Sequence, residues 1–171
     1  MRKSIIIALC CITVLFAACK KEKPYEKFVG DYLGQVLING TMDVPLFNYN
    51  QELVDQPFNM NLTLTQGTTD DQVILTYHPE GQNETYATTG TIVNDFVDFE
   101  PINIETDVDQ SHIKASFDFE GTLVDNVQLA MKGTINGNGT IQMGQDIPIP
   151  TPFTITGTAK GTLIKQVEPE K

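Results

Sequence analysis

The sequence has no tryptophan, two histidines, three cysteines and, in Arg2, a single arginine. Lys114 and Lys132 are the only bases between Phe28 and Ala159, a stretch that holds 18 acidic residues. Proteins that bind nucleic acid neutralise phosphates with Lys and Arg, so this composition excludes that class of partner. The same negative charge disfavours direct binding to an anionic lipid surface.

The motifs of the common hydrolases and metalloenzymes are also missing. There is no G-x-S-x-G elbow, no H-E-x-x-H pair and no Walker loop. His78 and His112 lie far apart in the sequence, and a metal site needs about three or four converging ligands. We therefore expect histidines exposed near strand ends, no cofactor and no enzymatic activity. Paired carboxylates remain an alternative route to hydrolysis, because acids are plentiful.

Long apolar runs are absent except at the start of the chain. Arg2 and Lys3 precede an apolar stretch from Ile5 to Phe16. As a helix this stretch would rise only ~18 Å, too little for a ~30 Å hydrocarbon core. The pattern is that of a secretory signal peptide, so residues 1–18 are left out of the fold.

The segment Leu15-Phe16-Ala17-Ala18-Cys19 resembles the lipobox of bacterial lipoproteins. It departs from that pattern at Phe16, where leucine is commoner. The alternative is ordinary cleavage after Ala18 without a lipid, but a bulky Phe16 does not suit a site that needs small side chains. The resemblance implies a multiply acylated Cys19, carrying palmitate-type chains that anchor the protein stably. It also implies the outer membrane of a Gram-negative bacterium, with the periplasmic and the external face both open.

The lipid would use the last thiol of the mature chain. Cys10 and Cys11 belong to the signal peptide, so no disulfide and no thiolate metal site can form. The domain must then be held by its core alone, which is feasible at this length. The expected organisation is a signal peptide 1–18, a lipidated tether 19–27, one domain 28–167 and a tail 168–171.

Apolar and polar residues alternate along most of the mature chain. This period of two is typical of strands with one dry and one wet face, and no segment has the helical period over three turns. The sequence therefore predicts an all-β domain. The clearest apolar faces are Met60, Leu62 and Leu64; Val73, Leu75 and Tyr77; Ile113, Ala115, Phe117 and Phe119; and Val127, Leu129 and Met131.

Turn residues separate these runs. Asn136-Gly137-Asn138-Gly139 is the strongest predicted hairpin turn, because Asn-Gly readily adopts the positive φ angles of a type I′ turn. Residues 41–57 are irregular and predict a longer loop, with at most one short strand. Residues 147–152 contain three prolines and predict an extended crossing outside the sheet. Weaker turn candidates are Asn39-Gly40, Gln66-Gly67, Gly81-Gln82-Asn83 and Asn94-Asp95.

Several glycines continue the apolar face of a strand, among them Gly133, Gly157 and Gly161. Glycine weakens a strand unless the sheet bends sharply or another backbone approaches closely. Sheets that curl into barrels need such positions, whereas a flat sandwich needs fewer. We therefore predict an up-and-down antiparallel barrel, with a β-sandwich as the alternative.

Two terminal segments, Phe28-Val29-Gly30-Asp31-Tyr32-Leu33-Gly34 and Gly157-Thr158-Ala159-Lys160-Gly161, together with the Asn-Gly pairs and the Pro-rich crossing, resemble the calycin-like (lipocalin-like) β-barrel lipoproteins. The likeness covers roughly residues 28–165. It implies a barrel of about eight strands whose lumen is either filled or holds one small ligand. True lipocalins carry Gly-x-Trp on the first strand and a late arginine packed over it; this chain has Gly30-Asp31-Tyr32 and no late arginine. The resemblance supplies no site residues.

Six apolar residues are predicted to line the lumen, either as plain core or as the wall of a ligand cavity. The first functional hypothesis is a non-enzymatic envelope lipoprotein that binds a small apolar ligand in the barrel. The alternative is a protein-binding or structural module that acts through loops such as residues 41–57. The candidate lumen residues are Tyr32, Met60, Leu62, Phe117, Phe119 and Met131.

Acidic residues gather in residues 95–100 and again at Glu105, Asp107 and Asp109. Carboxylate-rich loops bind calcium through about six to eight oxygens. Alternation, however, places these three side chains on the strand face opposite Ile104, and there is no glycine at the middle of an EF-hand spacing. We interpret the cluster as the solvated face of the barrel, with calcium binding as the alternative.

Overall fold

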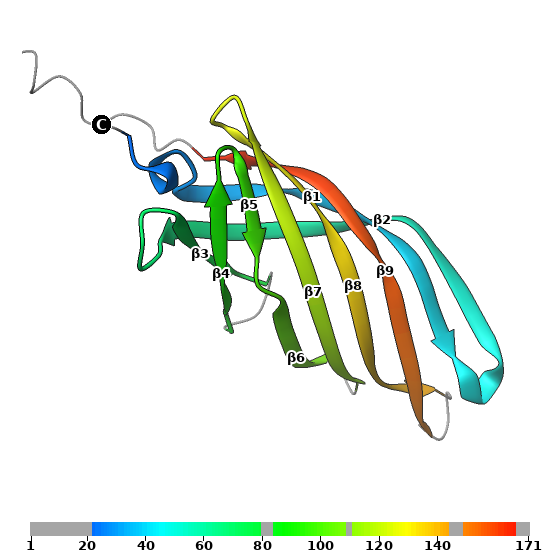
Figure 1. Cartoon of the computed structure of the whole chain (residues 1–171). Helices are drawn as coiled ribbons and strands as arrows, with labels where there is room; N and C mark the ends of the chain where they lie inside the picture. The colour runs from blue at the N-terminus through cyan, green and yellow to red at the C-terminus, as the bar shows by residue number, and fades with distance from the viewer. Residues whose placement is uncertain (1–21, 80–83, 109–110, 144–148, 167–171) are drawn as a thin grey trace, which may run out of the picture.

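The computed structural model describes residues 22–79, 84–108, 111–143 and 149–166 (Figure 1). These residues form one antiparallel sheet, which confirms the predicted all-β class. Two short 3-10 helices, η1 (Pro24–Lys27) and η2 (Pro45–Phe47), accompany it. The strands are β1 (Gly30–Val44), β2 (Tyr49–Gln66), β3 (Gln72–Tyr77), β4 (Tyr86–Val93), β5 (Phe96–Phe99), β6 (Ile102–Val108), β7 (Ser111–Val124), β8 (Gln128–Met143) and β9 (Ile149–Lys165).

The sheet curls until its hydrogen bonding forms a ring. Its order is β5-β4-β3-β2-β1-β9-β8-β7-β6, and β5 pairs with β7 to close it. β5 and β6 follow one another along the same edge of β7, with Val97 opposite Gly121 and Ile104 opposite Ala115. The ring therefore has eight strand positions, as expected of an up-and-down barrel, rather than the two sheets of a sandwich.

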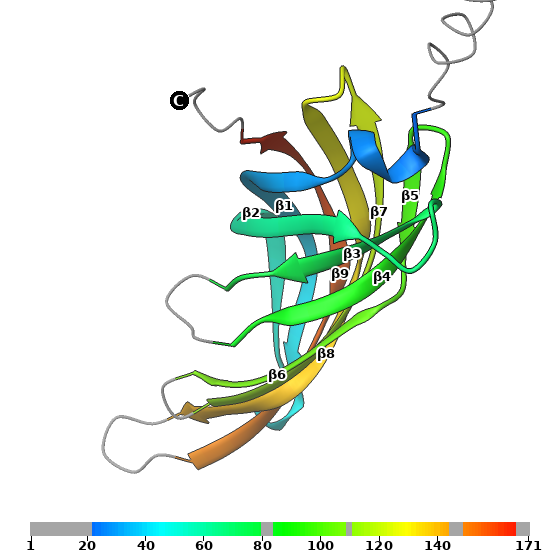
Figure 2. The ribbon, with the colours of Figure 1, turned by 90° about the vertical axis from the view of Figure 1, so that its left-hand side faces the viewer.

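The ring is complete at one end only. β3, β4 and β5 are short and bridge β2 to β7 in what we call the closed half. In the other half, residues 49–60 of β2 pair only with β1, and β6 pairs only with β7. Figures 1 and 2 show the long strands running on past the short ones. We call this part the open half, and β2 and β6 each have a free edge along it.

The closed half is plugged by the start of the domain. Phe28, which follows η1, is fully buried, and Tyr32 of β1 donates a hydrogen bond of 2.8 Å to its carbonyl oxygen. The Lys165 ammonium group, from the end of β9, lies 5.9 Å from the centre of the Tyr32 ring and donates to the carbonyl of Lys27 at 3.0 Å. Burial raises the pKa of Tyr32 to about 12 and lowers the pKa of Lys165. These contacts hold β1, the end of β9 and η1 together.

Glycines on the inner face let neighbouring strands approach closely. A Cβ added at Gly133 would overlap the carbonyl oxygen of Asp118, and one at Gly161 would overlap that of Gln35. Gly30 has a φ of +147° and lies under Lys165. These close approaches support the argument that glycines inside the strands mark a curled sheet.

Three turn predictions are wrong. Asn136 to Gly139 lies inside β8, paired with β7 and β9, because glycine is needed there on the inner face rather than in a turn. Asn39-Gly40 lies inside β1, where the Asn39 amide bonds Asp55 across a bulge in β2. Residues 41–57 are not a loop: they form a tight β1–β2 hairpin, because the bulge interrupts the alternation without ending the strand.

The prediction that residues 147–152 cross outside the sheet is wrong for residues 149–152. Pro150 and Pro152 lie in the first part of β9 and are paired with β8. β1 pairs with β9 only up to Thr154, so the missing N–H groups lie beside an unoccupied stretch of edge. Residues 147 and 148 lie outside the described part. The predicted turns at Gln66-Gly67 and Asn94-Asp95 are confirmed, whereas Gly81 to Asn83 lies outside the described residues.

Candidate functional site

The side chains of all six predicted lumen residues lie on the inner face of the barrel. Tyr32, Met60, Leu62, Phe119 and Met131 are buried in the core, and Phe117 is partly buried against it. The rings of Phe117 and Phe119 stack with their centres 5.8 Å apart. The alternation therefore identified the inner face correctly, and Phe117 marks where that face begins to open.

The closed half is filled by its own side chains. Leu62, Leu64, Leu75, Leu129 and Leu163 are all completely buried. The hollow found on the inner face lies at the boundary with the open half and measures about 10 Å³. A volume of this size is that of a single water molecule at most. Its lining is wholly apolar: Phe58, Met60, Tyr77, Ile102, Ile104, Phe117 and Phe119.

The tip of the β1–β2 hairpin carries exposed apolar side chains. Pro45 begins η2, and Asn48 reverses the chain with a φ of 47°. Between and beside them, Leu46 is 60% exposed, Phe47 50% and Tyr49 47%. We call these three residues the hairpin tip. Polar side chains would satisfy such a turn equally well, so the apolar ones are not explained by the local fold.

The sequence argument did not single out the hairpin tip residues, although it did name residues 41–57 as a candidate interaction segment. The signal was available in the run Pro45-Leu46-Phe47-Asn48-Tyr49, in which proline and asparagine bracket two large apolar residues. That pattern combines turn chemistry with apolar side chains that have no strand face on which to be buried.

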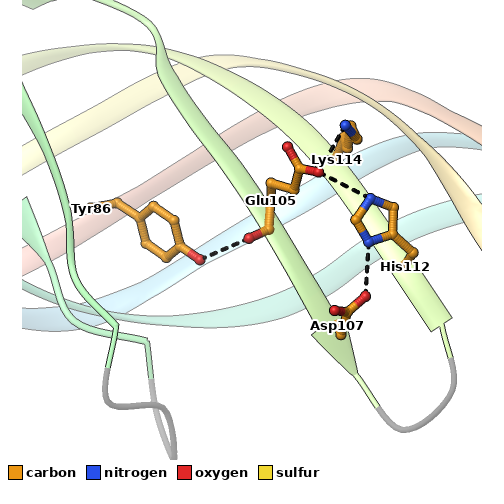
Figure 3. Close-up of polar contacts among 5 residues, drawn as sticks. All are labelled: Tyr86, Glu105, Asp107, His112 and Lys114. Carbon is orange, nitrogen blue, oxygen red and sulfur yellow. Dashed lines mark hydrogen bonds and ion pairs between the residues drawn. The ribbon is translucent and has the colours of Figure 1, made fainter.

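A polar cluster lies on the outer face of β6 and β7 (Figure 3). Glu105 accepts from Lys114 at 2.8 Å and lies 3.2 Å from His112, whose other ring nitrogen lies 2.8 Å from Asp107. The hydrogen bond from Lys114 is the main reason why the pKa of Glu105 is lowered. All four side chains are largely exposed, which agrees with the interpretation of these acids as a solvated face.

The other candidates do not converge. His78 is half-buried, with Nε2 3.4 Å from the Thr63 hydroxyl. Cys19 and Asp109 lie outside the described residues. Within the part of the chain that the structure describes, no group of three or more His, Cys, Asp or Glu side chains has the arrangement of a metal site. The calcium alternative therefore gains no support from Glu105 and Asp107.

Comparisons with known proteins give no identity to carry over. No family model matches the chain, and no curated protein matches it either. Among the described residues, no helix has the length and apolar character needed to span a membrane. The function must be argued from the geometry itself.

Proposed function

We propose that this protein is a non-enzymatic lipoprotein of the outer membrane whose barrel presents a binding surface to a protein partner. The observation that carries the proposal is the hairpin tip: three large apolar side chains within four residues of one turn, each about half exposed, at the far end of the barrel. Clustered exposed apolar groups on a soluble domain mark interaction sites, whereas scattered ones do not.

The position of the tether supports this assignment. Cys19 precedes Pro24 of η1 by five residues, which reach at most about 18 Å when extended. η1 lies at the closed end, and the hairpin tip lies at the other end of β1 (Figure 1). The 15 residues of β1 correspond to about 50 Å. A lipid on Cys19 would therefore hold the plugged end near the bilayer and leave the tip free to meet a partner.

We propose a calycin-like relationship on the ground of one contact at the closed end. Lipocalins pack a late arginine over a first-strand tryptophan; here Lys165, at the end of the last strand, lies over Tyr32 of Gly30-Asp31-Tyr32. Lysine and tyrosine can make the same cation–π contact as arginine and tryptophan, at lower strength. A small apolar ligand inside the barrel has less support, because the inner hollow holds only about 10 Å³.

The anchor is tested by growing cells with an alkyne analogue of palmitate and detecting label on the protein. We expect label on the wild type and none on Cys19→Ala, which should also leave the outer-membrane fraction. Unlabelled wild-type protein, released in soluble form after cleavage, would show that the signal peptide is an ordinary one.

The binding surface is tested by placing a photo-crosslinking amino acid at Phe47 in the full-length lipoprotein in intact cells. The matched control is Val93, which is 61% exposed at the end of β4 in the closed half. We expect one discrete adduct from position 47 and none from 93, and we expect Leu46→Ser to weaken that adduct. Equal crosslinking from both positions, or none from 47, would contradict the proposal.

A further inference from the structure

The free edge of β6 offers unused backbone hydrogen-bonding groups. On β7, the backbone N–H of Leu123 donates to the carbonyl of Asp95. The backbone N–H and C=O groups of the odd-numbered residues of β7 are therefore directed toward β5 and β6. Because Ile104 is paired with Ala115, the backbone N–H and C=O groups of the even-numbered residues of β6 are directed toward β7. The N–H and C=O groups of Asn103, Glu105 and Asp107 consequently face away from the sheet, and no strand of the described chain pairs with them.

The side chain of Tyr86 reaches this edge across the gap. The Tyr86 hydroxyl lies 3.4 Å from the Glu105 carbonyl oxygen and 3.0 Å from the Glu84 carboxylate. A hydroxyl has one proton, and the closer, charged carboxylate is the stronger acceptor. Figure 3 shows this contact between the Tyr86 hydroxyl and the Glu105 carbonyl, which at 3.4 Å is a long one. A backbone N–H would be a better donor to the carbonyl.

The opposite edge of the open half is protected in a way that β6 is not. The backbone N–H of His78 donates to the Asn61 carbonyl. The backbone groups of the odd-numbered residues of β2 near Asn61 are therefore directed away from β1, toward the free edge, and Pro57 is one of these residues. Proline offers no N–H there, and the bulge at Asp55, with a φ of 46°, bends the edge further. Proline and bulges are the devices by which proteins prevent strand pairing at an edge. The two edges are thus unequal.

The surroundings of the β6 edge specify the side chains of an added strand. On the inner side lie the apolar side chains of Phe58, Ile104 and Phe117, which are only partly buried. On the outer side, the exposed carboxylates of Glu105 and Asp107 lie beside the Lys114 ammonium group and the His112 ring. Because successive residues of a strand point to opposite faces, an added strand would place alternate side chains in these two environments.

We propose that the β6 edge binds an extended segment of a partner protein in which apolar and basic residues alternate. The segment adds an antiparallel or parallel strand to β6, its backbone pairs with Asn103, Glu105 and Asp107, and the Tyr86 hydroxyl is displaced from the Glu105 carbonyl. A second copy of this chain is the wrong occupant, because pairing β6 with β6 would bring like carboxylates together. This site is separate from the hairpin tip, so the two proposals fail independently.

The test uses the purified mature domain and synthetic peptides of seven residues, the length of β6. The probe alternates valine and lysine, and binding is followed by fluorescence anisotropy and calorimetry. Three control peptides each change one property: alternating valine and glutamate reverses the charge, a valine block followed by a lysine block breaks the alternation, and methylation of alternate backbone nitrogens removes donors while keeping the charge. We expect each control to bind at least about tenfold more weakly than the probe.

Variants of the edge complete the experiment. Glu105→Pro removes the backbone N–H that is directed toward the free edge and that pairs with no strand of the described chain. Glu105→Ala keeps that N–H and removes the carboxylate. We expect proline to abolish binding and alanine to weaken it severalfold. The methylated peptide gives the same information on the unaltered protein if the proline variant does not fold. Failure of the probe to bind, or equal binding of the methylated and unmethylated peptides, would overturn the proposal.

Discussion

The closed and the open half of this barrel are made by the same strands but are held together differently. In the closed half, leucines, Phe28 and Tyr32 fill the space between opposite walls and are almost completely buried. In the open half, Ile38, Phe58, Ile104 and Phe117 lie on the same inner face and are only partly covered. The alternation is alike in the two halves, so what differs is whether β3, β4 and β5 supply a facing wall.

This comparison shows how a barrel with a filled core can still offer a binding surface. The closed half supplies stability close to the tether, because buried side chains fill its interior. The open half gives up part of that burial, and in return it keeps an apolar face, a free strand edge and the hairpin tip accessible. Regions with low local stability are those from which binding elements are commonly drawn.

The largest expected effect is a loss of packing in the closed half. Leu62→Ala leaves a cavity in a fully buried site and should lower the free energy of unfolding by about 3–5 kcal/mol. Ile104→Ala, on the partly covered inner face of the open half, should cost about 1–2 kcal/mol. Urea titrations of the mature domain measure both. Equal losses at the two positions would show that the halves are packed alike.

Alkaline pH sharpens the comparison through Tyr32. The pKa of Tyr32 is raised from its ordinary value of 10.0 to about 12 in the folded state. The contribution of neutral Tyr32 to the free energy of unfolding is therefore complete below pH 10.0 and is lost as the pH rises toward about 12. The loss amounts to roughly 2–3 kcal/mol, at ~1.4 kcal/mol per pH unit. The variant Tyr32→Phe should lose this pH dependence, while Tyr49→Phe at the hairpin tip should keep it. An unchanged alkaline profile in Tyr32→Phe would contradict the assignment.

Curvature can be tested at inner-face glycines. A methyl group at Gly133 would overlap backbone, so Gly133→Ala should destabilise the domain by about 1–3 kcal/mol. At Gly121 the nearest atom, 2.9 Å from an added Cβ, is the end of the Leu129 side chain, which can move. Gly121→Ala should therefore cost less. Thermal melts compare the two, and a Gly133→Ala variant as stable as the wild type would mean that the strands do not approach so closely.

The smallest effect is expected at the polar cluster of the open half. The pKa of Glu105 is lowered, chiefly by its hydrogen bond from Lys114, so the ion pair stabilises the fold above the ordinary value of 4.5 and is lost as pH falls through the lower folded value. Glu105→Gln should shift the urea midpoint slightly at neutral pH and not at all in acid. A large shift at neutral pH would show that this exposed cluster is structural.

The strands and the inner face could be read from the sequence because alternation is a local property. Met60 to Leu64 and Ile113 to Phe119 were placed on the correct face. Turns were harder. The β7–β8 turn is Asp125-Asn126, with φ angles of 54° and 57°, and it contains no glycine, whereas the stronger Asn136-Gly137 signal lies in a strand. There, close contact with a neighbouring strand outweighs the local preference.

The open half and its free edges could not be read from the sequence. Whether β6 has a second neighbour depends on where β3, β4 and β5 end relative to strands far away in the chain. The role of Pro57 becomes clear only when the outward direction of its nitrogen is known. The position of the hairpin tip could not be read either, because the bulge at Asp55 interrupts the alternation although residues 49–66 form one strand.

The most direct test of a barrel closed at one end and open at the other is native-state amide hydrogen exchange, read residue by residue. Val97 and Gly121, which pair across the seam between β5 and β7, should exchange only when the whole domain unfolds. Asn103, Glu105 and Asp107, whose N–H groups face the free edge, should exchange almost as fast as in an unfolded chain. Strong protection of those three amides, or rapid exchange at the seam, would contradict this account.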